Sequence, residues 1–380
     1  MRRIKKYIHS NTKWPNFYWD HKKILSILAK ARNLQGKLVG KMESIGFELQ
    51  NEAVLKTLTL DILKSSEIEG EYLEKKQVRS SIARRLGINI TNPIVSERSV
   101  DGFVDIMIDA THYYKTPLTA ERLFNWHEAL FPTGRSGMNR ITVADWRKDT
   151  DGPMQVVSGA IGKEKIHFQA PSSEFIDEEM KDFLVWFEKK DNNSNNNKDE
   201  QIDLVLKAAI AHLWFVTIHP FEDGNGRITR VITDMLLARS DNSIQRFYSM
   251  SAQILIERKE YYNVLEKTQK GDLDITNWIL WFWNCMINAI NSSEIILLNV
   301  LSKATFWKLH STTILNERQN KMINKLFDDF KGKLTSSKWG KITKCSQDTA
   351  LRDIQDLVKK KILQKEIGGG RSTSYELYDK

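Results

Sequence analysis

Residues 218–230 decide how this chain is interpreted, and they read Ile218-His219-Pro220-Phe221-Glu222-Asp223-Gly224-Asn225-Gly226-Arg227-Ile228-Thr229-Arg230. Two glycines on either side of an asparagine let the backbone turn sharply and present successive N–H groups. Apolar runs over 202–218 and 228–237 flank the segment, so we expect a buried helix before the turn and another helix after it. A turn that leads into a helix N-terminus is a favourable site for an anion.

The two arginines of this segment indicate which anion. Arg227 and Arg230 are three residues apart and would share one face of the first helical turn. Cations at a helix N-terminus oppose the macrodipole, so two of them there indicate a bound anion that offsets the cost. Polyphosphate is the natural candidate, and Asp223 could hold the Mg²⁺ that accompanies it. A calcium loop is excluded because its third ligand would be Arg227, and a P-loop because Gly-Lys-Ser/Thr is missing.

The composition predicts a cytoplasmic, soluble protein of two or three domains. The net charge of +9 is moderate for 380 residues and fits a protein that meets phosphates, without implying nucleic acid. Only Cys285 and Cys345 are present, which indicates a reducing compartment and argues against a structural zinc site. The basic residues 1–6 lack a signal-peptide pattern, and the most apolar window, 278–290, is too short for a bilayer. We therefore expect no membrane contact.

An acidic turn follows the helix expected over residues 51–64. It reads Ser65-Ser66-Glu67-Ile68-Glu69-Gly70-Glu71, and Gly70 is placed to end the helix as its C′ residue. Glutamates in a last helical turn interact unfavourably with the helix dipole. On local grounds the turn is simply solvated, unless one of its glutamates has a cationic partner elsewhere in the chain.

The one clear β region is a hairpin over residues 154–170, which includes Val156, Val157, Ile166 and Phe168. A lone hairpin among helices either packs against a helix or keeps an exposed edge for a partner strand. The polar loop 191–199 lacks the glycine and glutamate of a calcium loop, so we interpret it as a surface insertion.

The C-terminal region predicts a winged helix-turn-helix. Helices are expected over 320–330, 337–344 and 346–358, followed by a strand, a glycine turn and a second strand. Candidates for DNA contact are Gln347, Thr349, Arg352, Gln355 and Arg371. Three acids would repel phosphate, namely Asp348, Asp353 and Asp356. Winged helices also bind proteins, so DNA contact and protein contact both stay open.

Residues 219–230 match the Fic family motif, His-Pro-Phe-x-Asp/Glu-Gly-Asn-Gly-Arg-x-x-Arg, at every defined position, and the chain resembles Fic proteins over roughly residues 93–290. The resemblance implies transfer of AMP from ATP to a Ser, Thr or Tyr hydroxyl of a target protein, with release of pyrophosphate. It makes His219 the general base, a role that suits an imidazole near neutral pH. It makes Asp223 the Mg²⁺ ligand and assigns the phosphates to Gly224, Asn225, Gly226, Arg227 and Arg230, with Arg230 towards the γ-phosphate.

The resemblance also gives the acidic turn a role. Ser65-x-x-x-Glu69-Gly70 is similar to the inhibitory helix motif of the family, in which Glu69 would pair with Arg230 and obstruct γ-phosphate binding. Glu67 and Glu71 are expected to stay solvated. The hairpin 154–170 resembles the flap that aligns a target segment by strand addition. The segment 14–20 resembles a small domain of unknown function that precedes some Fic cores.

These observations predict a mainly α protein: an all-helical Fic core with a β-hairpin flap, an N-terminal helical domain and a C-terminal winged helix-turn-helix. The expected boundaries are 1–60, 61–92 for the inhibitory segment, 93–305 for the core, and 310–380. The expected function is an autoinhibited protein adenylyltransferase. Two alternatives stay open: a hydrolase that removes AMP, with Glu69 positioning the water, and a DNA-binding regulator. The resemblance leaves the target protein and a homodimer open.

Overall fold

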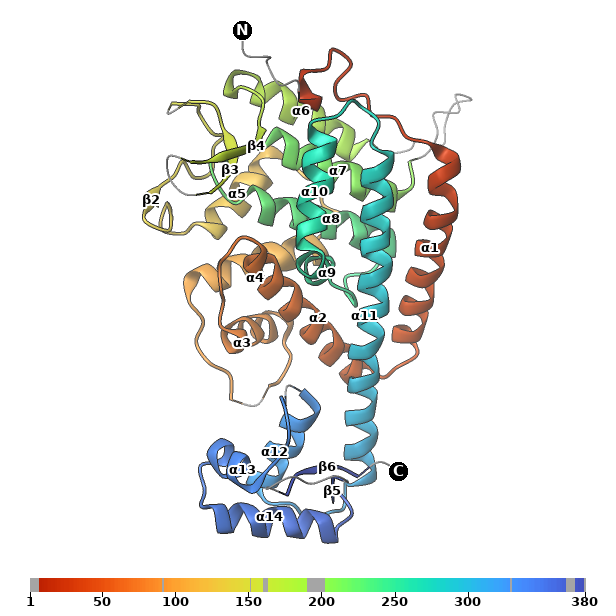
Figure 1. Cartoon of the computed structure of the whole chain (residues 1–380), viewed down its shortest axis with the longest axis vertical. Helices are drawn as coiled ribbons and strands as arrows, with labels where there is room; N and C mark the ends of the chain where they lie inside the picture. The colour runs from red at the N-terminus through yellow and green to blue at the C-terminus, as the bar shows by residue number, and fades with distance from the viewer. Residues whose placement is uncertain are drawn as a thin grey trace. The chain divides into compact units, whose positions relative to one another are not determined.

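The computed structural model describes residues 7–90, 92–150, 152–159, 163–189, 202–328, 330–366 and 373–378, and it is mainly α-helical (Figure 1). Three of the segments discussed above lie outside the described residues: the N-terminus 1–6, the polar loop 191–199, and the glycine turn that includes Arg371. The chain forms two compact units, Met1–Glu294 and Ile295–Lys380.

The first unit is built from helices. In chain order they are η1 (Ile8–Ser10), α1 (His21–Glu43), α2 (Phe47–Ile68), α3 (Lys75–Leu86), α4 (Arg98–His112), α5 (Ala120–Leu130), η2 (Ser173–Phe175), α6 (Ile176–Glu188), α7 (Leu204–Ile218), α8 (Asn225–Asp241), α9 (Met250–Ile256), α10 (Arg258–Gln269) and α11 (Thr276–Leu309). The last part of α11, from Ile295, belongs to the second unit. Helix α2 is longer than the segment 51–64 predicted from its pattern, and it carries Ser65 inside its last turn.

Helices α7 and α8 form the centre of the first unit (Figure 1). Every residue of α7 from Val205 to Ile218 is buried, as its apolar pattern all round predicted. The indole N–H groups of Trp278 and Trp283 in α11 donate to α7 carbonyls, at 2.7 Å to Ala209 and 3.4 Å to Val205. The segment between α7 and α8 therefore connects two helices that are buried in the core of the unit.

Among the described residues, α11 is the one helix that is long and apolar enough to cross a membrane by length and composition. It spans 34 residues and so exceeds the apolar window 278–290 that the sequence suggested. Trp278, Phe282 and Trp283 in its N-terminal half are fully buried in the first unit, as in the core helix of a globular domain. The absence of membrane contact stays a prediction.

The described strands form three two-stranded antiparallel sheets: β1 (Arg135–Ser136) with β2 (Asn139–Arg140), β3 (Gln155–Ser158) with β4 (Lys165–Gln169), and β5 (Leu363–Lys365) with β6 (Tyr375–Leu377). The β3–β4 pair is the predicted hairpin, and β1–β2 was not predicted. In β3–β4 the register shifts between Val156, which pairs with Phe168, and Val157, which pairs with Ile166. His167 is therefore an extra residue in a β-bulge.

The second unit contains α12 (Glu317–Asp328), α13 (Ser336–Thr343), α14 (Gln347–Lys359) and the β5–β6 hairpin. This is the predicted order of three helices and a hairpin, and Ser346 caps α14 by accepting from Thr349 N. The core of the unit includes Met322, Trp339, Ile354 and Leu357, all fully buried. The division between the units falls inside α11, whereas the sequence-based boundary at 305–310 lies near the end of that helix.

Candidate functional site

His219 ends α7 in the left-handed conformation, with φ 54° and ψ 56°. Its Nδ1 lies 3.2 Å from the carbonyl oxygen of Val216. A carbonyl can only accept, so Nδ1 carries the hydrogen and Nε2 of the neutral ring keeps its lone pair. Burial lowers the pKa of His219, which keeps the ring neutral at physiological pH. The geometry therefore leaves Nε2 available as a base.

Arg147 holds the backbone at His219 and at the proline that follows it. Its buried guanidinium donates from Nε to the carbonyl of His219 (2.8 Å) and from Nη2 to the carbonyl of Pro171 (2.5 Å), just after β4. Its backbone N–H donates to the carbonyl of Pro220 (2.9 Å). One side chain thus ties the histidine loop to the base of the β3–β4 hairpin. No sequence pattern indicates this contact, because Arg147 is an isolated arginine in an irregular segment, 72 residues from His219.

The Gly-Asn-Gly turn is held from inside. Gly224 is left-handed at φ 80°, and a Cβ there would lie 2.8 Å from a ring carbon of Phe131, so both conformation and space require glycine. The Asn225 side chain accepts from Phe221 N (2.9 Å) and donates to Phe221 O (2.8 Å). The asparagine side chain therefore closes the loop. The α8 amides that follow lack intrahelical partners, as at any helix start.

Asp223 is oriented by three neighbours. Its carboxylate accepts from Gly224 N (2.6 Å) and from the hydroxyl of Ser136. Its carbonyl accepts from Nε2 of His127 at 3.1 Å, while Nδ1 of His127 accepts from Ala144 N at 3.3 Å. Burial lowers the pKa of His127 to about 4, so this ring is neutral and its tautomer is set by the two contacts. His127 positions Asp223, a function that its place in a helical pattern did not reveal.

The donors around Asp223 fit a metal that arrives with a ligand. No group of three or more His, Cys, Asp or Glu side chains capable of holding a metal occurs in the described part of the chain. Asp223 and Ser136 supply hard oxygen donors. Mg²⁺ is commonly bound through one or two carboxylates, substrate phosphates and water. The donor set therefore suits an ion carried by a polyphosphate.

Arg230 makes the ion pair with Glu69 that the sequence suggested. Its side chain is 2% exposed, and Nη2 lies 2.8 Å from Oε1 of Glu69. Nε donates to the hydroxyl of Ser65 (2.8 Å), and Nη2 also donates to the Ser65 carbonyl (2.9 Å). Three oxygens from the end of α2 thus surround one buried guanidinium of α8, which explains why a glutamate is tolerated in the last turn of α2.

Glu69 also lies directly over the second glycine of the turn. A Cβ on Gly226 would come within 2.1 Å of Oε1 of Glu69. Helix α2 ends there in a Schellman motif: Gly70 is left-handed at φ 84°, its N–H donates to Glu67 O, and Glu71 N–H donates to Ser66 O. The predicted C′ role of Gly70 is therefore correct. A carboxylate of α2 occupies the anion site at the N-terminus of α8.

A model of the Fic/DOC family matches residues 117–237. The chain carries a Fic/DOC domain. A model of a domain of unknown function (DUF4172) matches residues 7–88, which spans the two N-terminal segments that the sequence-based division at residue 60 separated.

The curated relatives align with the Fic domain. Protein adenylyltransferase fic-1 of Caenorhabditis elegans is 33% identical over 106 residues, which are 28% of this chain and 18% of that protein. Protein adenylyltransferase Fic of Nematostella vectensis is 31% identical over 105 residues, 27% of this chain and 21% of that protein. The chain therefore spans about a fifth of each relative. The crystal structure of a Fic family protein from Desulfovibrio desulfuricans G20 is 18% identical with a TM-score of 0.50, over 96% of this chain and 98% of that one, and so shares the fold.

The other arginine of the Fic motif also has an acidic partner. Nη1 of Arg227 lies 2.5 Å from Oε2 of Glu71, and the side chains are 5% and 44% exposed. The expectation that Glu71 stays solvated is therefore wrong. The Schellman turn reverses the chain at Gly70 and so presents Glu71 to the first turn of α8. Glu67 instead pairs with Lys64 in its own helix, at 2.5 Å.

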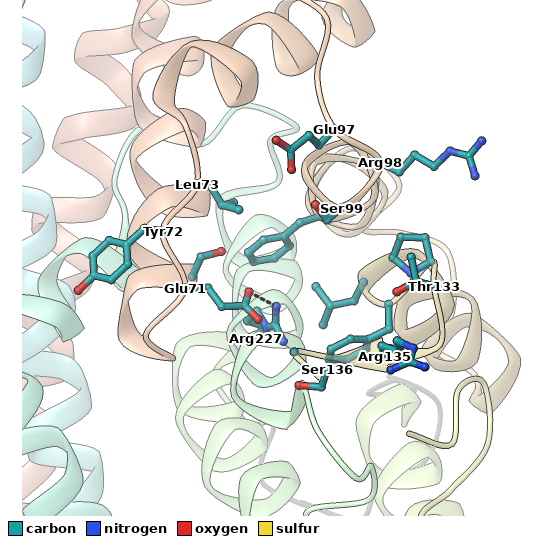
Figure 2. A pocket seen from close by; sticks show the side chains of 16 residues that line it. Glu71, Tyr72, Leu73, Glu97, Arg98, Ser99, Thr133, Arg135, Ser136 and Arg227 are labelled. Atoms are coloured by element: carbon teal, nitrogen blue, oxygen red, sulfur yellow. Dashed lines mark hydrogen bonds and ion pairs between the residues drawn. The ribbon is translucent and has the colours of Figure 1, made fainter. Parts of the chain in front are cut away.

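A pocket of about 610 Å³ opens beside this second pair. Figure 2 shows Glu71 and Arg227 joined across it, with Ser136 and Arg135 on the neighbouring wall. Ser136 is the residue whose hydroxyl binds Asp223. The pocket thus reaches the Fic motif from the side of Arg227, and Glu71 is part of its lining.

The hairpin of the Fic domain exposes part of the predicted docking surface. Val156, Val157 and Ile166 are 36%, 47% and 39% exposed, whereas Phe168 is 2% exposed. Phe168 packs against Tyr7 with ring centroids 5.2 Å apart. The bulge at His167 interrupts the alternation of β4, so Phe168 anchors the hairpin and does not share the exposed face.

Proposed function

We propose that this chain is a protein adenylyltransferase that moves AMP from ATP to a Ser, Thr or Tyr hydroxyl of a target protein and is held inactive by Glu69. The observation that carries the proposal is the ion pair between Glu69 and Arg230, because it puts a carboxylate on a buried anion site beside a neutral histidine. The names of the relatives that match the Fic domain support the same reaction.

The chemistry follows from the groups around the turn. Nε2 of His219 takes the proton of the target hydroxyl, and the hydroxyl oxygen attacks the α-phosphorus of ATP. The bond from that phosphorus to the bridging oxygen breaks, and pyrophosphate leaves. Arg227 and Arg230 neutralise the polyphosphate, while Gly224, Asn225 and Gly226 offer backbone amides at the N-terminus of α8. Positioning and charge stabilisation supply most of the rate enhancement, as in phosphoryl transfer generally.

Asp223, with the hydroxyl of Ser136, would hold Mg²⁺ at this site. When bound, the ion neutralises phosphate charge. His127 holds the backbone carbonyl of Asp223, and the Gly224 N–H holds its carboxylate, so the residue that would bind the ion is ordered before the nucleotide arrives. Preorganised donors of this kind lower the reorganisation needed in the reaction.

Two features supply regulation and target binding. Glu69 and the γ-phosphate compete for Arg230, so productive nucleotide binding requires Glu69 to leave. The exposed Val156, Val157 and Ile166 suit addition of a target strand to the hairpin, which reads backbone more than side chains. The target protein is therefore a partner with an extended segment that carries the modified hydroxyl.

The test follows label from α-labelled ATP and Mg²⁺ onto the protein. We expect Glu69→Gly to raise labelling and Glu67→Gly, a control in the same turn that pairs with Lys64, to leave it unchanged. In the Glu69→Gly background, His219→Ala should abolish transfer to every hydroxyl that lacks a base of its own. Equal labelling of wild type and Glu69→Gly would contradict autoinhibition, and undiminished transfer without His219 would contradict its role as base.

Removal of AMP from a modified protein is a second candidate. It is favoured by the position of Glu69, whose carboxylate lies over Gly226 and is one-third exposed, where it could orient a water molecule. Wild-type protein that releases free AMP from an AMP-modified substrate, together with a Glu69→Gly variant that does not, would establish the hydrolase. The reverse order of activity would exclude it.

A DNA-binding role of the second unit is a further candidate. The repulsion expected from its acids is reduced, because Asp353 is buried against Arg318 (2.7 Å) and Asp356 pairs with Lys360 (2.5 Å). Gln347, Arg352 and Gln355 remain exposed on α14. A mobility shift of the full chain that weakens with salt and with Arg352→Ala would support DNA contact. A shift that Arg352→Ala leaves unchanged would exclude this face.

Location and assembly are inferred from the composition and the family resemblance. Cys285 and Cys345 are both free thiols, which suits a reducing compartment. We propose a cytoplasmic protein. A homodimer stays a prediction, to be measured by light scattering across a range of concentrations.

A further inference from the structure

A second histidine outside the Fic motif is held in a chain of hydrogen bonds. Nε2 of His167 lies 2.6 Å from the hydroxyl oxygen of Ser158, and Nδ1 lies 2.7 Å from Oε2 of Glu266. Ser158 ends β3, His167 is in β4, and Glu266 is in α10. A hydroxyl, an imidazole and a carboxylate in this order form the arrangement in which a histidine activates a hydroxyl nucleophile.

The protonation state follows from the partners. Burial opposes ionisation of Glu266, but hydrogen bonds from Lys270 and His167 outweigh it and lower the pKa of Glu266 to about 2. An ionised carboxylate only accepts, so Nδ1 of His167 carries a hydrogen. In the neutral ring Nε2 then accepts the hydrogen of the Ser158 hydroxyl. The charge of Glu266 stabilises the imidazolium that forms when that proton is transferred.

Local structure explains how the three groups meet. The bulge makes His167 an unpaired residue, and bulges commonly re-aim a side chain. The β4 strand lies beside α10, the helix that supplies Glu266 (Figure 1). The side chains of His167 and Glu266 are 26% and 25% exposed, and Ser158 is exposed. The hydroxyl is therefore both accessible and paired with a base.

We propose that Ser158 is a self-modification site of this protein, at which His167, oriented by Glu266, serves as the base. The inference rests on the proposed function for its source of ATP. The oxygen of Ser158 attacks the α-phosphorus, its proton passes to Nε2 of His167, and the bond to the bridging oxygen breaks to release pyrophosphate. The product is an AMP group on Ser158 in phosphodiester linkage.

Modification at this position has a structural consequence. Ser158 follows Val157, which belongs to the exposed face of the hairpin. AMP on Ser158 replaces the hydrogen that its hydroxyl donates to His167 and places a charged nucleotide beside the surface proposed for strand addition. Self-modification therefore weakens target docking.

The experiment uses the full chain carrying Glu69→Gly, incubated with ATP and Mg²⁺ and analysed by mass spectrometry. Trypsin yields the peptide 149–163, which contains two hydroxyl residues, Thr150 and Ser158. Thr150 is exposed, and no contact with an imidazole is recorded for it among the described residues, so it serves as a control in the same peptide. We expect AMP on Ser158, unchanged by Thr150→Ala. His167→Gln and Glu266→Gln should each lower it at least tenfold while leaving AMP on other peptides unchanged.

The readouts separate this inference from the proposed function. AMP on other peptides with none on Ser158, or on Ser158 at a level that His167→Gln leaves unchanged, would overturn the inference and leave the proposed function standing. If no AMP appears on any peptide, the proposed function fails and a second probe decides the chemistry at Ser158. That probe is a fluorophosphonate, whose phosphorus reacts with an activated serine. Labelling of Ser158 that His167→Gln removes supports the activated hydroxyl, and no labelling overturns it.

Discussion

Oε2 of Glu71 lies 2.5 Å from Nη1 of Arg227. Glu69, two residues earlier in the chain, pairs with Arg230. Both arginines of the Fic motif are thus neutralised by carboxylates from one helix end. The contact that we propose to be inhibitory is a double one, and its second half was not expected from the family motif.

The two carboxylates should contribute unequally to inhibition. We expect Glu71→Gln alone to raise AMP transfer at most about fivefold, because a pair with a half-exposed partner contributes only ~0.2–1 kcal/mol. Glu69→Gly should raise it about ten- to a hundredfold, since its partner Arg230 is buried and hydrogen bonds to charged groups are stronger. Initial rates at subsaturating ATP measure both, and a larger effect of Glu71→Gln would reverse the assignment.

Arg147 should matter for rate more than for nucleotide binding. It donates to the carbonyl of His219 and to that of Pro171, so Arg147→Lys removes the forked geometry while keeping the charge. We expect kcat to fall about a hundredfold, the loss typical of a small misplacement of a reacting group. Lys148→Arg, at an exposed neighbour, is the control. A change confined to KM for ATP would contradict a positioning role.

Gly226 and Glu69 should be coupled in stability. A Cβ on Gly226 would lie 2.1 Å from Oε1 of Glu69, so Gly226→Ala should destabilise the protein by about 1–3 kcal/mol. In the Glu69→Gly background that clash is gone, and the same substitution should lower stability much less. Urea unfolding of the four proteins in this double-mutant cycle gives the coupling energy. Additive effects would show that the carboxylate moves aside freely.

Two buried histidines should make the fold sensitive to acid. Burial lowers the pKa of His127 to about 4 and that of His212 to about 3, from 6.5. Their folded pKa values lie below the unfolded value, so the unfolded chain binds more protons as pH falls from 6.5 to 4, and stability decreases in that window. For His127 the loss is about 3 kcal/mol. Tm measured against pH should fall less steeply in His127→Gln than in wild type or in the exposed control His21→Gln.

The pH dependence of activity should be set by the protonation of His219, not by that of His127 or His212. Burial lowers the pKa of His219, so the base stays neutral as pH is reduced from 8 through 6.5. In a Glu69→Gly background we expect kcat to be level over that range and to fall only at more acidic pH, where the ring gains a proton. A decline that begins above pH 7 would show that the ring titrates at a higher pH than its burial implies.

The features that could be predicted from the sequence are those that a short local pattern determines. Gly70 was predicted as a helix terminator from its position alone, and Ser65 and Glu69 from a short motif whose spacing is one helical turn. Glu71 was assigned wrongly because nothing local indicates which way the chain turns after a left-handed glycine. Its partner Arg227 lies 156 residues away, and only tertiary packing brings the two together.

The residues that orient the site were also invisible in the sequence. His127 and Arg147 act through backbone carbonyls of residues far along the chain, and such contacts leave no trace in the identity of the accepting residue. Phe168 was included in the docking flap, but it is buried against Tyr7, a contact between residues far apart in the chain that the strand pattern does not indicate. The acids of α14 were judged repulsive because their partners, Arg318 and Lys360, cannot be read from helix periodicity.

The last turn of α2 is held by hydrogen bonds from two arginines. Arg230 donates to the carbonyl of Ser65, and Arg258 donates to that of Ile68 at 2.8 Å, so two cations from different helices hold the last turn of α2, directly before the two carboxylates. Release then means fraying of one helical turn, a local opening with its own free energy. If one molecule in a hundred is active at rest, that opening lies about 2.8 kcal/mol uphill. Hydrogen exchange at the amides of residues 66–69 would measure the free energy of that opening without any substrate.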